Sequence, residues 1–421
     1  MNSLSPITAA EAAPFSLASA PGHSGAVFSA AQNLLPRLER GQRVDAEILR
    51  AAMEAAFGAS DASGAWDWKL AYDACEAATV LFLRKYGKVL FRKGGSPAAI
   101  LPMVAKIAGL LPTHTRRSVE SETFQQFSTP IPLALAAATA ASITPADRVL
   151  EPSTGTGLLA ILGEIAGATL LLNELADTRA GLLSSLFPAV SVTRFDAAQI
   201  DDHLDPAAIP SVVLMTPPFS ALANVSGRVA DTAYRHIASA LARLTDGGRL
   251  VATTGASFAP DAPAWRDAFA RLQERGRVVF TAAIDGAVYA KHGTTIDTRL
   301  TVIDKTPADD PGMFPTSPGI APDVATLLGW VGTHVPARLP MTPMVPPPAA
   351  SAPVPRTVRG YLARNAATAS KAVLAEPEGI ELVYEIIDWT PPEGANLTDA
   401  IYEEYSSNRS ASPAPRGIPP S

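Results

Sequence analysis

The sequence of 421 residues contains a single cysteine and only six histidines. One cysteine excludes an intrachain disulfide framework and a zinc site built from several thiolates. Cys75 lies in the helix-like stretch YDACEAA, where we expect it to be a small core residue. The histidines His114, His203, His236 and His292 are scattered along the chain, so we expect surface or core residues and predict no metal site.

Charged residues are also scarce, at 18% of the chain, against 47% hydrophobic residues. A formal net charge of −6 argues against binding nucleic acid through overall charge, so such binding would need a local basic patch. Polar and proline residues break the apolar runs well before the length that spans a membrane. The first residues, MNSLSPITAAEAAPF, have no basic segment followed by an apolar run. We therefore expect no secretory signal and no membrane partner, and a cytoplasmic protein.

The chain is too long for one typical core, and its composition divides it into four segments. Residues 1–25 are rich in Ala and Ser, which predicts a disordered N-terminus. Residues 26–118 carry apolar residues at three- and four-residue spacing and predict a helical domain of their own. Residues 119–306 alternate strand and helix patterns, whereas residues 307–421 predict a Pro/Ala-rich linker and a largely disordered tail with one strand-like run.

The alternation within residues 119–306 predicts an α/β fold with a doubly wound, Rossmann-like and largely parallel sheet. Strands are expected at 148–151, 169–173, 191–194, 211–215 and 249–253, and helices at 132–142, 158–166, 176–187, 232–244 and 264–275. Two further extended runs, 278–283 and 297–303, are expected to form an antiparallel hairpin at the edge of the sheet.

The segment EPSTGTG follows the first of these strands and precedes a helix. Gly155 and Gly157 allow a tight turn and the close approach of a ligand, and the following helix offers free N–H groups. The same letters match the dinucleotide pattern G-x-G-x-x-A, with Glu174 at a suitable distance. Glu151 favours a different cofactor, because a carboxylate there can pair with the cationic part of S-adenosylmethionine but would repel a pyrophosphate.

Two acidic residues follow the next strands. Glu174 ends the second strand, where a carboxylate can accept both hydroxyls of a ribose. Asp196 follows the third strand and could accept from the adenine amino group of the cofactor. An equally good interpretation of Asp196 is the N-cap of the segment that follows it.

A second loop, TPPF, follows the apolar run VVLM. Pro217 and Pro218 fix the backbone and donate no N–H, which leaves a carbonyl free to accept a hydrogen bond from an exocyclic amine. Phe219 can stack on a flipped base, although a rigid turn closed by a core phenylalanine has the same letters. Upstream, Ser128 and Thr129 could cap a helix or hold the methionine end of a cofactor.

The order of FSTP, EPSTGTG, NE and TPPF along the chain resembles that of amino-group adenine methyltransferases of the γ arrangement. The wider chain resembles the N-terminal methylase-like region of bacterial strawberry notch-type proteins, in which a helicase module follows. The likeness is strong over residues 121–304 and includes the stretches DGGRLVATT and HGTTIDTRLTV. The chain itself contains no G-x-x-x-x-G-K-[ST] phosphate loop, so a helicase module is expected only as a possible partner.

The resemblance implies a site for S-adenosylmethionine made of Phe127, Thr129, Pro130, Glu151, Pro152, Ser153, Gly155, Gly157, Glu174 and Asp196. It implies a site for the target amine made of Thr216, Pro217, Pro218 and Phe219. The family's usual residue at position 216 is Asn or Asp, whose side-chain oxygen accepts from the amine, whereas the shorter threonine hydroxyl can donate instead.

The resulting hypothesis is methyl transfer to an exocyclic amine of a nucleobase, with N6 of adenine in DNA as the expected target. Cytosine-5 methylation is not expected, because its nucleophilic cysteine would have to be Cys75, away from both loops. A second hypothesis is a module that keeps the fold, binds nucleic acid or a partner protein, and transfers no methyl group. Thr216 favours this module, whereas the two glycines, Glu174 and Pro-Pro-Phe favour an enzyme.

Nucleic acid would meet the chain at a basic patch in front of the α/β region. The patch comprises Arg84, Lys85, Lys88, Arg92 and Lys93, with Tyr86 and Phe91 interleaved and Arg116 and Arg117 further on. An ordinary solvated helix face has the same pattern.

Overall fold

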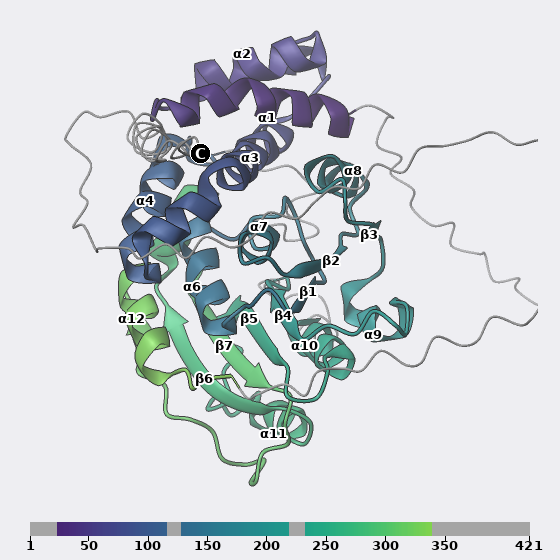
Figure 1. Ribbon diagram of the computed structural model, residues 1–421, viewed down its shortest axis with the longest axis vertical. Coiled ribbons are helices and arrows are strands. Elements are labelled where there is room, and N and C mark those ends of the chain that lie inside the picture. Colours follow the sequence, from purple (N-terminus) through teal and green to yellow (C-terminus); the bar gives the residue numbers. More distant parts are fainter. Residues whose placement is uncertain (1–22, 116–127, 219–231, 339–421) are drawn as a thin grey trace, which may run out of the picture. The chain divides into compact units, whose positions relative to one another are not determined.

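The structure is a computed structural model that describes residues 23–115, 128–218 and 232–338 (Figure 1). Its centre is an eight-stranded sheet in the order β3-β2-β1-β4-β5-β7-β6-β8. The strands are β1 (Arg148–Glu151), β2 (Thr169–Asn173), β3 (Val192–Thr193), β4 (Val212–Met215), β5 (Arg249–Gly255), β6 (Arg277–Ile284), β7 (Thr298–Asp304) and β8 (Ile320–Ala321).

Strands β3, β2, β1, β4 and β5 pair in parallel, in the doubly wound pattern that the sequence predicts. β7 runs antiparallel and lies between β5 and β6, with Leu250 opposite Ile303. The predicted antiparallel pairing of the last two runs is therefore confirmed. Their predicted place at the edge is wrong, because β8 pairs in parallel with β6 beyond them. β8 begins directly after Gly319, whose φ is 123°.

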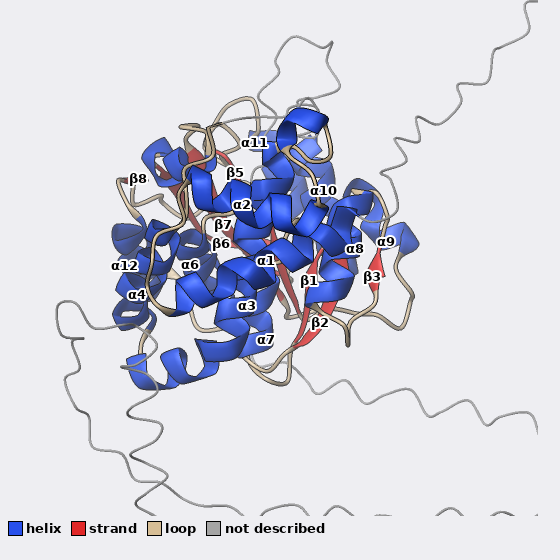
Figure 2. Cartoon of the chain, turned by 90° about the horizontal axis from the view of Figure 1, so that it is seen from above, coloured by secondary structure: helices blue, strands red, loops and turns tan. Residues whose placement is uncertain are grey.

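Helices cover both faces of the sheet, so its central strands are buried on both sides (Figure 2). All four residues of β4 are buried, and they alternate between the two faces as strand geometry requires. Val212 and Leu214 belong to one apolar core, whereas Val213 and Met215 belong to the other. A strand buried on both faces has a continuous apolar sequence, so the apolar run VVLM predicts a buried strand at this point of the chain.

The helices that precede and cover the sheet are α1 (His23–Glu39), α2 (Ala46–Phe57), α3 (Trp68–Gly94), α4 (Pro97–Leu110), α6 (Ile131–Ala141), α7 (Ala160–Ile165) and α8 (Asp177–Leu186). Later in the chain come α9 (Ile200–His203), α10 (Thr232–Arg243), α11 (Arg266–Gln273), α12 (Val324–His334) and the 3₁₀ helices η1 (Asp61–Ser63), η2 (Ala197–Gln199) and η3 (Gly286–His292).

The helices α1 to α4 do not form the separate domain that the sequence predicts over residues 26–118. Their buried residues, such as Leu34 and Phe82, share one continuous core with Ile161 of α7 and Leu133 of α6. The same compact unit contains the sheet. The helices α1 to α4 bury their apolar face against the helices that cover the sheet, because an apolar helix face must pack on another layer.

Two predicted boundaries also change. α1 begins at His23, inside the segment 1–25 that was expected to be disordered. β8 and α12 lie inside the segment 307–421, which was expected to be linker and tail. Asp323 caps α12 by accepting from the backbone N–H of Thr326 at 2.8 Å. The strand-like run at 380–389 and the rest of the predicted tail beyond residue 338 fall outside the described residues.

No helix within the described residues has both the length and the apolar character needed to cross a membrane.

Candidate cofactor and substrate site

The candidate site lies where the parallel strands β1, β2 and β4 end. β1 is the central strand of the three and pairs with both neighbours. Because the carboxyl ends of parallel strands meet at one edge of a sheet, the loops after Glu151, Asn173 and Met215 emerge side by side. The two motif-bearing loops of the sequence are thereby brought to the same edge.

The turn after β1 is fastened to β2 by Thr154. Its backbone N–H donates to the carbonyl of Asn173 at 3.0 Å, and its hydroxyl bonds the carbonyls of Glu151 and Asn173. Gly155 and Gly157 have φ values of 60° and 90°, a region that side-chain-bearing residues rarely adopt. The predicted glycine turn is therefore present.

Packing adds a second reason for the glycine at position 157. A Cβ there would lie 2.6 Å from the ring of Phe187, at the end of α8. At Gly155 the nearest atom to such a Cβ is the Arg179 guanidinium, at 3.8 Å. The sequence predicts both glycines for a tight turn and the close approach of a ligand, and the structure shows that Gly157 also lets α8 pack against the turn.

Glu174, directly after β2, holds the glycine turn from the other side. Its carboxylate accepts from the backbone N–H groups of Gly155 and Ala176, each at 2.8 Å. Burial raises the pKa of this carboxyl group, and the Arg179 charge and the two backbone donors oppose that shift. A carboxylate has about four acceptor positions, so two remain for the hydroxyls of a ribose.

Glu151, the last residue of β1, is a buried acid without its full set of partners. It is 2% exposed, and its Oε2 atom has no hydrogen-bond partner among the described residues. Burial raises the pKa of this carboxyl group well above the ordinary value, and the neighbouring Glu174 charge adds to the shift. A buried acid of this kind fits a ligand that brings a positive charge or a hydrogen-bond donor.

Asn173 ties three loops together at the same edge. Its side-chain amide donates to the carbonyls of Pro152 at 2.8 Å and Phe195 at 2.9 Å. Its oxygen accepts from the hydroxyl of Thr193 and the backbone N–H of Phe195. The sequence analysis quoted Asn173 only within the motif NE, and the structure shows that it fixes the relative positions of the strand ends.

Asp196 has the capping role that the sequence left open. Its Oδ1 atom accepts from the backbone N–H of Ala198 at 2.9 Å, at the start of η2. The residue is exposed, so its carboxylate is accessible from solvent. Ser153, also predicted to bind the cofactor, is partly exposed in the glycine turn.

The FSTP and TPPF motifs meet in the structure. The hydroxyls of Thr129 and Thr216 are 2.8 Å apart and hydrogen-bonded, although 87 residues separate them in the chain. Tyr289 of η3 lies against Thr129 from a third element, and burial raises the pKa of its phenol. Pro130 and Pro217 are buried beside this pair, whereas Pro218 is partly exposed. The other two predicted residues, Phe127 and Phe219, fall outside the described residues.

A row of charged residues on α3 faces the site, and the sequence analysis missed it. Lys69, Asp73 and Glu76 are buried, at spacings of four and three residues along one helix face. Asp73 accepts from the guanidinium of Arg179 at 2.7 and 3.2 Å. Glu76 accepts from the hydroxyl of Thr156, in the glycine turn, at 2.7 Å. The available signal was three charges at helical spacing within an otherwise apolar segment.

Two of the four histidines are not scattered, contrary to the prediction. His114 and His292 lie beside Glu76, and their ring centroids are 4.9 Å apart. Burial lowers the pKa of His114 to about 4, against the opposing charge of Glu76. Burial alone would raise the pKa of Glu76, but His292, His114 and Arg179 outweigh it and lower the pKa to about 2. His114 is therefore neutral and Glu76 ionised at neutral pH.

The other two histidines lie elsewhere. His203 stacks on Phe195, with ring centroids 5.2 Å apart. His236 is buried in α10, and burial lowers its pKa to about 4.

Two residues of the predicted basic patch form ion pairs with other residues of the chain. Arg84 pairs with Glu164 of α7 through two hydrogen bonds of 2.7 and 2.9 Å. Lys85 pairs with Glu39 at 2.7 Å. Tyr86 is buried, so it offers no ring for stacking on a base. Lys85, Lys88, Arg92 and Lys93 are exposed on α3, while Arg116 and Arg117 fall outside the described residues.

No family model and no curated protein matches the chain. Among solved structures, it is similar to a putative class I S-adenosylmethionine-dependent methyltransferase from Listeria monocytogenes, with 12% identity, a TM-score of 0.42 and coverage of 75% of this chain and 99% of that one. It is also similar to a modification subunit of a putative type I restriction enzyme from Vibrio vulnificus, with 14% identity, a TM-score of 0.38 and coverage of 56% and 62%.

A third similar structure is TrmN from Thermus thermophilus, with 19% identity, a TM-score of 0.31 and coverage of 42% of this chain and 49% of that one. The chain thus spans about half the length of the Thermus protein. The sheet order, with antiparallel β7 between β5 and β6, gives the chain a Rossmann-like α/β fold, as the sequence predicts.

Proposed function

We propose that this chain transfers a methyl group from S-adenosylmethionine to an exocyclic amine of a nucleobase, with N6 of adenine in DNA as the target. The observation that supports this most is Glu151, a buried acid at the mouth of a glycine turn whose Oε2 atom lacks a partner among the residues that the structure describes. A pyrophosphate would place negative charge beside that acid, whereas S-adenosylmethionine brings an ammonium and a sulfonium. The residues present therefore fit the methyl donor better than a dinucleotide.

Each residue around the glycine turn would contact a different part of the cofactor. Glu151 would accept from its cationic end, and Glu174 would accept from its ribose hydroxyls with the lone pairs that its two backbone donors leave open. Gly155 exposes backbone to the ligand at positive φ. Asp196, exposed after β3, is placed for the adenine amino group.

The bound cofactor supplies an electrophilic methyl group. The protein's own contribution is to orient the acceptor: the Pro217 carbonyl and the Thr216 side chain would accept hydrogen bonds from the amine and keep its nitrogen lone pair directed at the methyl carbon. On transfer of the methyl group the amine would lose one proton, which the exposed side of the site would pass to solvent. Neither a covalent enzyme intermediate nor a cysteine is required.

One observation favours a second candidate, a module that binds nucleic acid or a partner protein without methyl transfer. The Thr216 hydroxyl is already engaged by Thr129 at 2.8 Å, which leaves it less available to the amine. Such a module would serve as the methylase-like region of a strawberry notch-type helicase system.

The experiment is an assay of methyl transfer from labelled S-adenosylmethionine to unmethylated DNA and, in a separate reaction, to RNA, with the modified nucleosides separated by mass spectrometry. We expect N6-methyladenine. We also expect Thr216→Asn to increase the rate about fivefold, because one restored hydrogen bond is worth about 1 kcal/mol. Thr333→Asn, on the exposed face of α12, is the matched control and leaves the rate unchanged. Label found only in RNA would show that the target is RNA and not DNA. Cofactor binding without any methyl transfer would show that the chain is the binding module of the second candidate.

A further inference from the structure

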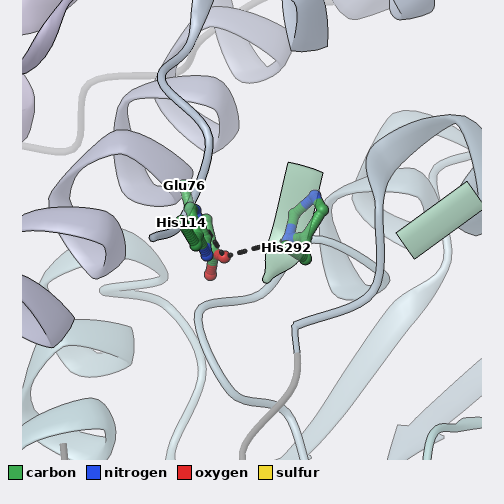
Figure 3. Close-up of side chains that lie close together, drawn as sticks. All are labelled: Glu76, His114 and His292. Atoms are coloured by element: carbon green, nitrogen blue, oxygen red, sulfur yellow. Dashed lines mark ion pairs between the residues drawn. The ribbon is translucent and has the colours of Figure 1, made fainter. Parts of the chain in front are cut away.

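Glu76, His114 and His292 come from three distant parts of the chain and meet at one point (Figure 3). Glu76 lies on α3, His114 lies in the segment after α4, and His292 is the last residue of η3. The Oε1 atom of Glu76 is 3.6 Å from Nδ1 of His292 and 4.0 Å from Nε2 of His114. Figure 3 shows the three side chains close together, with dashed lines for the ion pairs between them.

These distances are too long for hydrogen bonds and short enough for a shared ion. The Nδ1 atom of His292 is buried and has no hydrogen-bond partner within the described part of the chain. In a tetrahedral site with bonds of about 2.0–2.1 Å, neighbouring ligand atoms are roughly 3.3 Å apart. The three ligand atoms all lie within 4.8 Å of one another, so shifts of less than an ångström would close them around a cation.

The surroundings hold the three side chains in place. The second carboxylate oxygen of Glu76 accepts from Thr156 at 2.7 Å, and the ring of His114 stacks on Tyr72 with centroids 4.1 Å apart. The backbone N–H of His114 donates to the carbonyl of Lys291 at 2.8 Å, which ties its segment to η3. Metal ligands are commonly oriented by such outer hydrogen bonds.

Lys291 reinforces the same junction. Its ammonium donates to the carbonyls of Ala108, Gly109 and Leu111, each at 3.1 Å, and so closes the end of α4 against η3. The two histidines are thus presented by backbone that is fixed on both sides.

Two positive charges on or beside α3 are paired with a different carboxylate. Arg179 and Lys69 both pair with Asp73, one helical turn from Glu76. The Oε1 atom of Glu76 therefore faces the two imidazoles, and its carboxylate is the negative ligand of the set.

We propose that Glu76, His114 and His292 bind one divalent transition-metal ion, of which Zn²⁺ best suits two imidazoles and one carboxylate. A fourth position remains for water. The ion would join α3, the segment after α4 and η3, and through Thr156 it would brace the glycine turn of the cofactor site. Its role is one of positioning, and it stands whether or not the chain transfers methyl groups.

The test uses the full chain without a histidine tag, stripped by a chelator and titrated with Co²⁺ and then Zn²⁺. We expect one Co²⁺ per chain with the visible absorption of a low-coordinate nitrogen and oxygen site, and its displacement by one Zn²⁺. Glu76→Gln and His292→Asn should each abolish this absorption. Thr156→Val, which removes only the outer hydrogen bond, should weaken binding about 10–100-fold.

His203→Asn is the matched control, because this histidine lies outside the cluster, and it should bind as the unaltered chain does. Circular dichroism confirms that each variant is folded. Zn²⁺ should raise the melting temperature of the unaltered chain and of His203→Asn but not that of Glu76→Gln. Less than one equivalent bound by the unaltered chain, or unchanged binding in folded Glu76→Gln and His292→Asn, would overturn the proposal.

Discussion

Glu151→Gln should stabilise the free protein and weaken cofactor binding, two effects of opposite sign. In the free protein this buried acid has an oxygen without a partner in the described part of the chain, and burial raises its pKa. In the unfolded chain the same acid ionises freely, near a pKa of about 4.3. Folding therefore raises its proton affinity, so its contribution to stability falls as pH rises from the unfolded pKa towards the folded one.

The magnitude follows from what the substitution removes. The amide keeps the shape of the carboxyl group but carries no charge to desolvate, although it still leaves one polar atom without a partner. Each pKa unit between the folded and unfolded states corresponds to about 1.4 kcal/mol. We expect the free energy of unfolding at pH 8 to rise on the order of 1 kcal/mol, and the gain to disappear below about pH 4, where both states of the native acid are protonated.

Binding should respond in the other direction. A hydrogen bond between charged groups is worth about 1.5–3 kcal/mol, so Glu151→Gln should weaken S-adenosylmethionine binding roughly 10- to 150-fold. Because a cationic ligand favours the ionised acid, binding to the unaltered chain should also release a proton below the raised pKa of Glu151.

The assay combines chemical denaturation at several pH values with calorimetric titration in buffers of different ionisation enthalpy. S-adenosylmethionine contributes the same proton exchange of its own with both chains. The effect of Glu151 is therefore the difference in proton release between the unaltered chain and Glu151→Gln. A variant that is less stable than the unaltered chain at pH 8 and binds the cofactor equally well would refute this reasoning, since Glu151 would then be an ordinary structural acid.

The remaining predictions concern the scaffold of the site. Gly157→Ala should cost more stability than Gly155→Ala, by about 1–3 kcal/mol in denaturant unfolding, because only at position 157 does the new Cβ meet Phe187. Equal losses would show that backbone strain alone requires both glycines. Asp73→Asn should cost about 3–5 kcal/mol, because it leaves the buried guanidinium of Arg179 without its carboxylate. A loss below 1 kcal/mol would mean that water or Glu76 replaces that partner.

The sheet was largely predictable because its strands are buried on both faces. The runs RVLE and TLLLN have apolar centres, and β1 and β2 have the bounds that the sequence predicts. Position at a sheet edge is harder to predict, because it depends on which later segment pairs there. β8 has only two residues, within a stretch rich in Gly and Pro that resembles a linker.

The sequence predicts those residues of the candidate site that come directly after a strand. It does not predict the residues that meet only when distant segments fold together. The glycine turn and Glu174 lie directly after their strands, so position in the sequence locates them. Glu76 and Thr156 are 80 residues apart, and nothing in the spacing of either segment links them. The helical domain was misjudged for a related reason: periodicity shows that α3 has apolar faces, but it does not show what covers them.

The measurement that tests the account most directly is a calorimetric titration of the full chain with S-adenosylmethionine, beside Glu174→Ala. The account predicts saturable binding of one molecule per chain and a clear loss of affinity in the variant, because the variant removes the acceptor for the ribose hydroxyls and the acid that holds the Gly155 N–H. No binding by the folded, unaltered chain at millimolar cofactor would contradict it, and so would equal affinity in the variant.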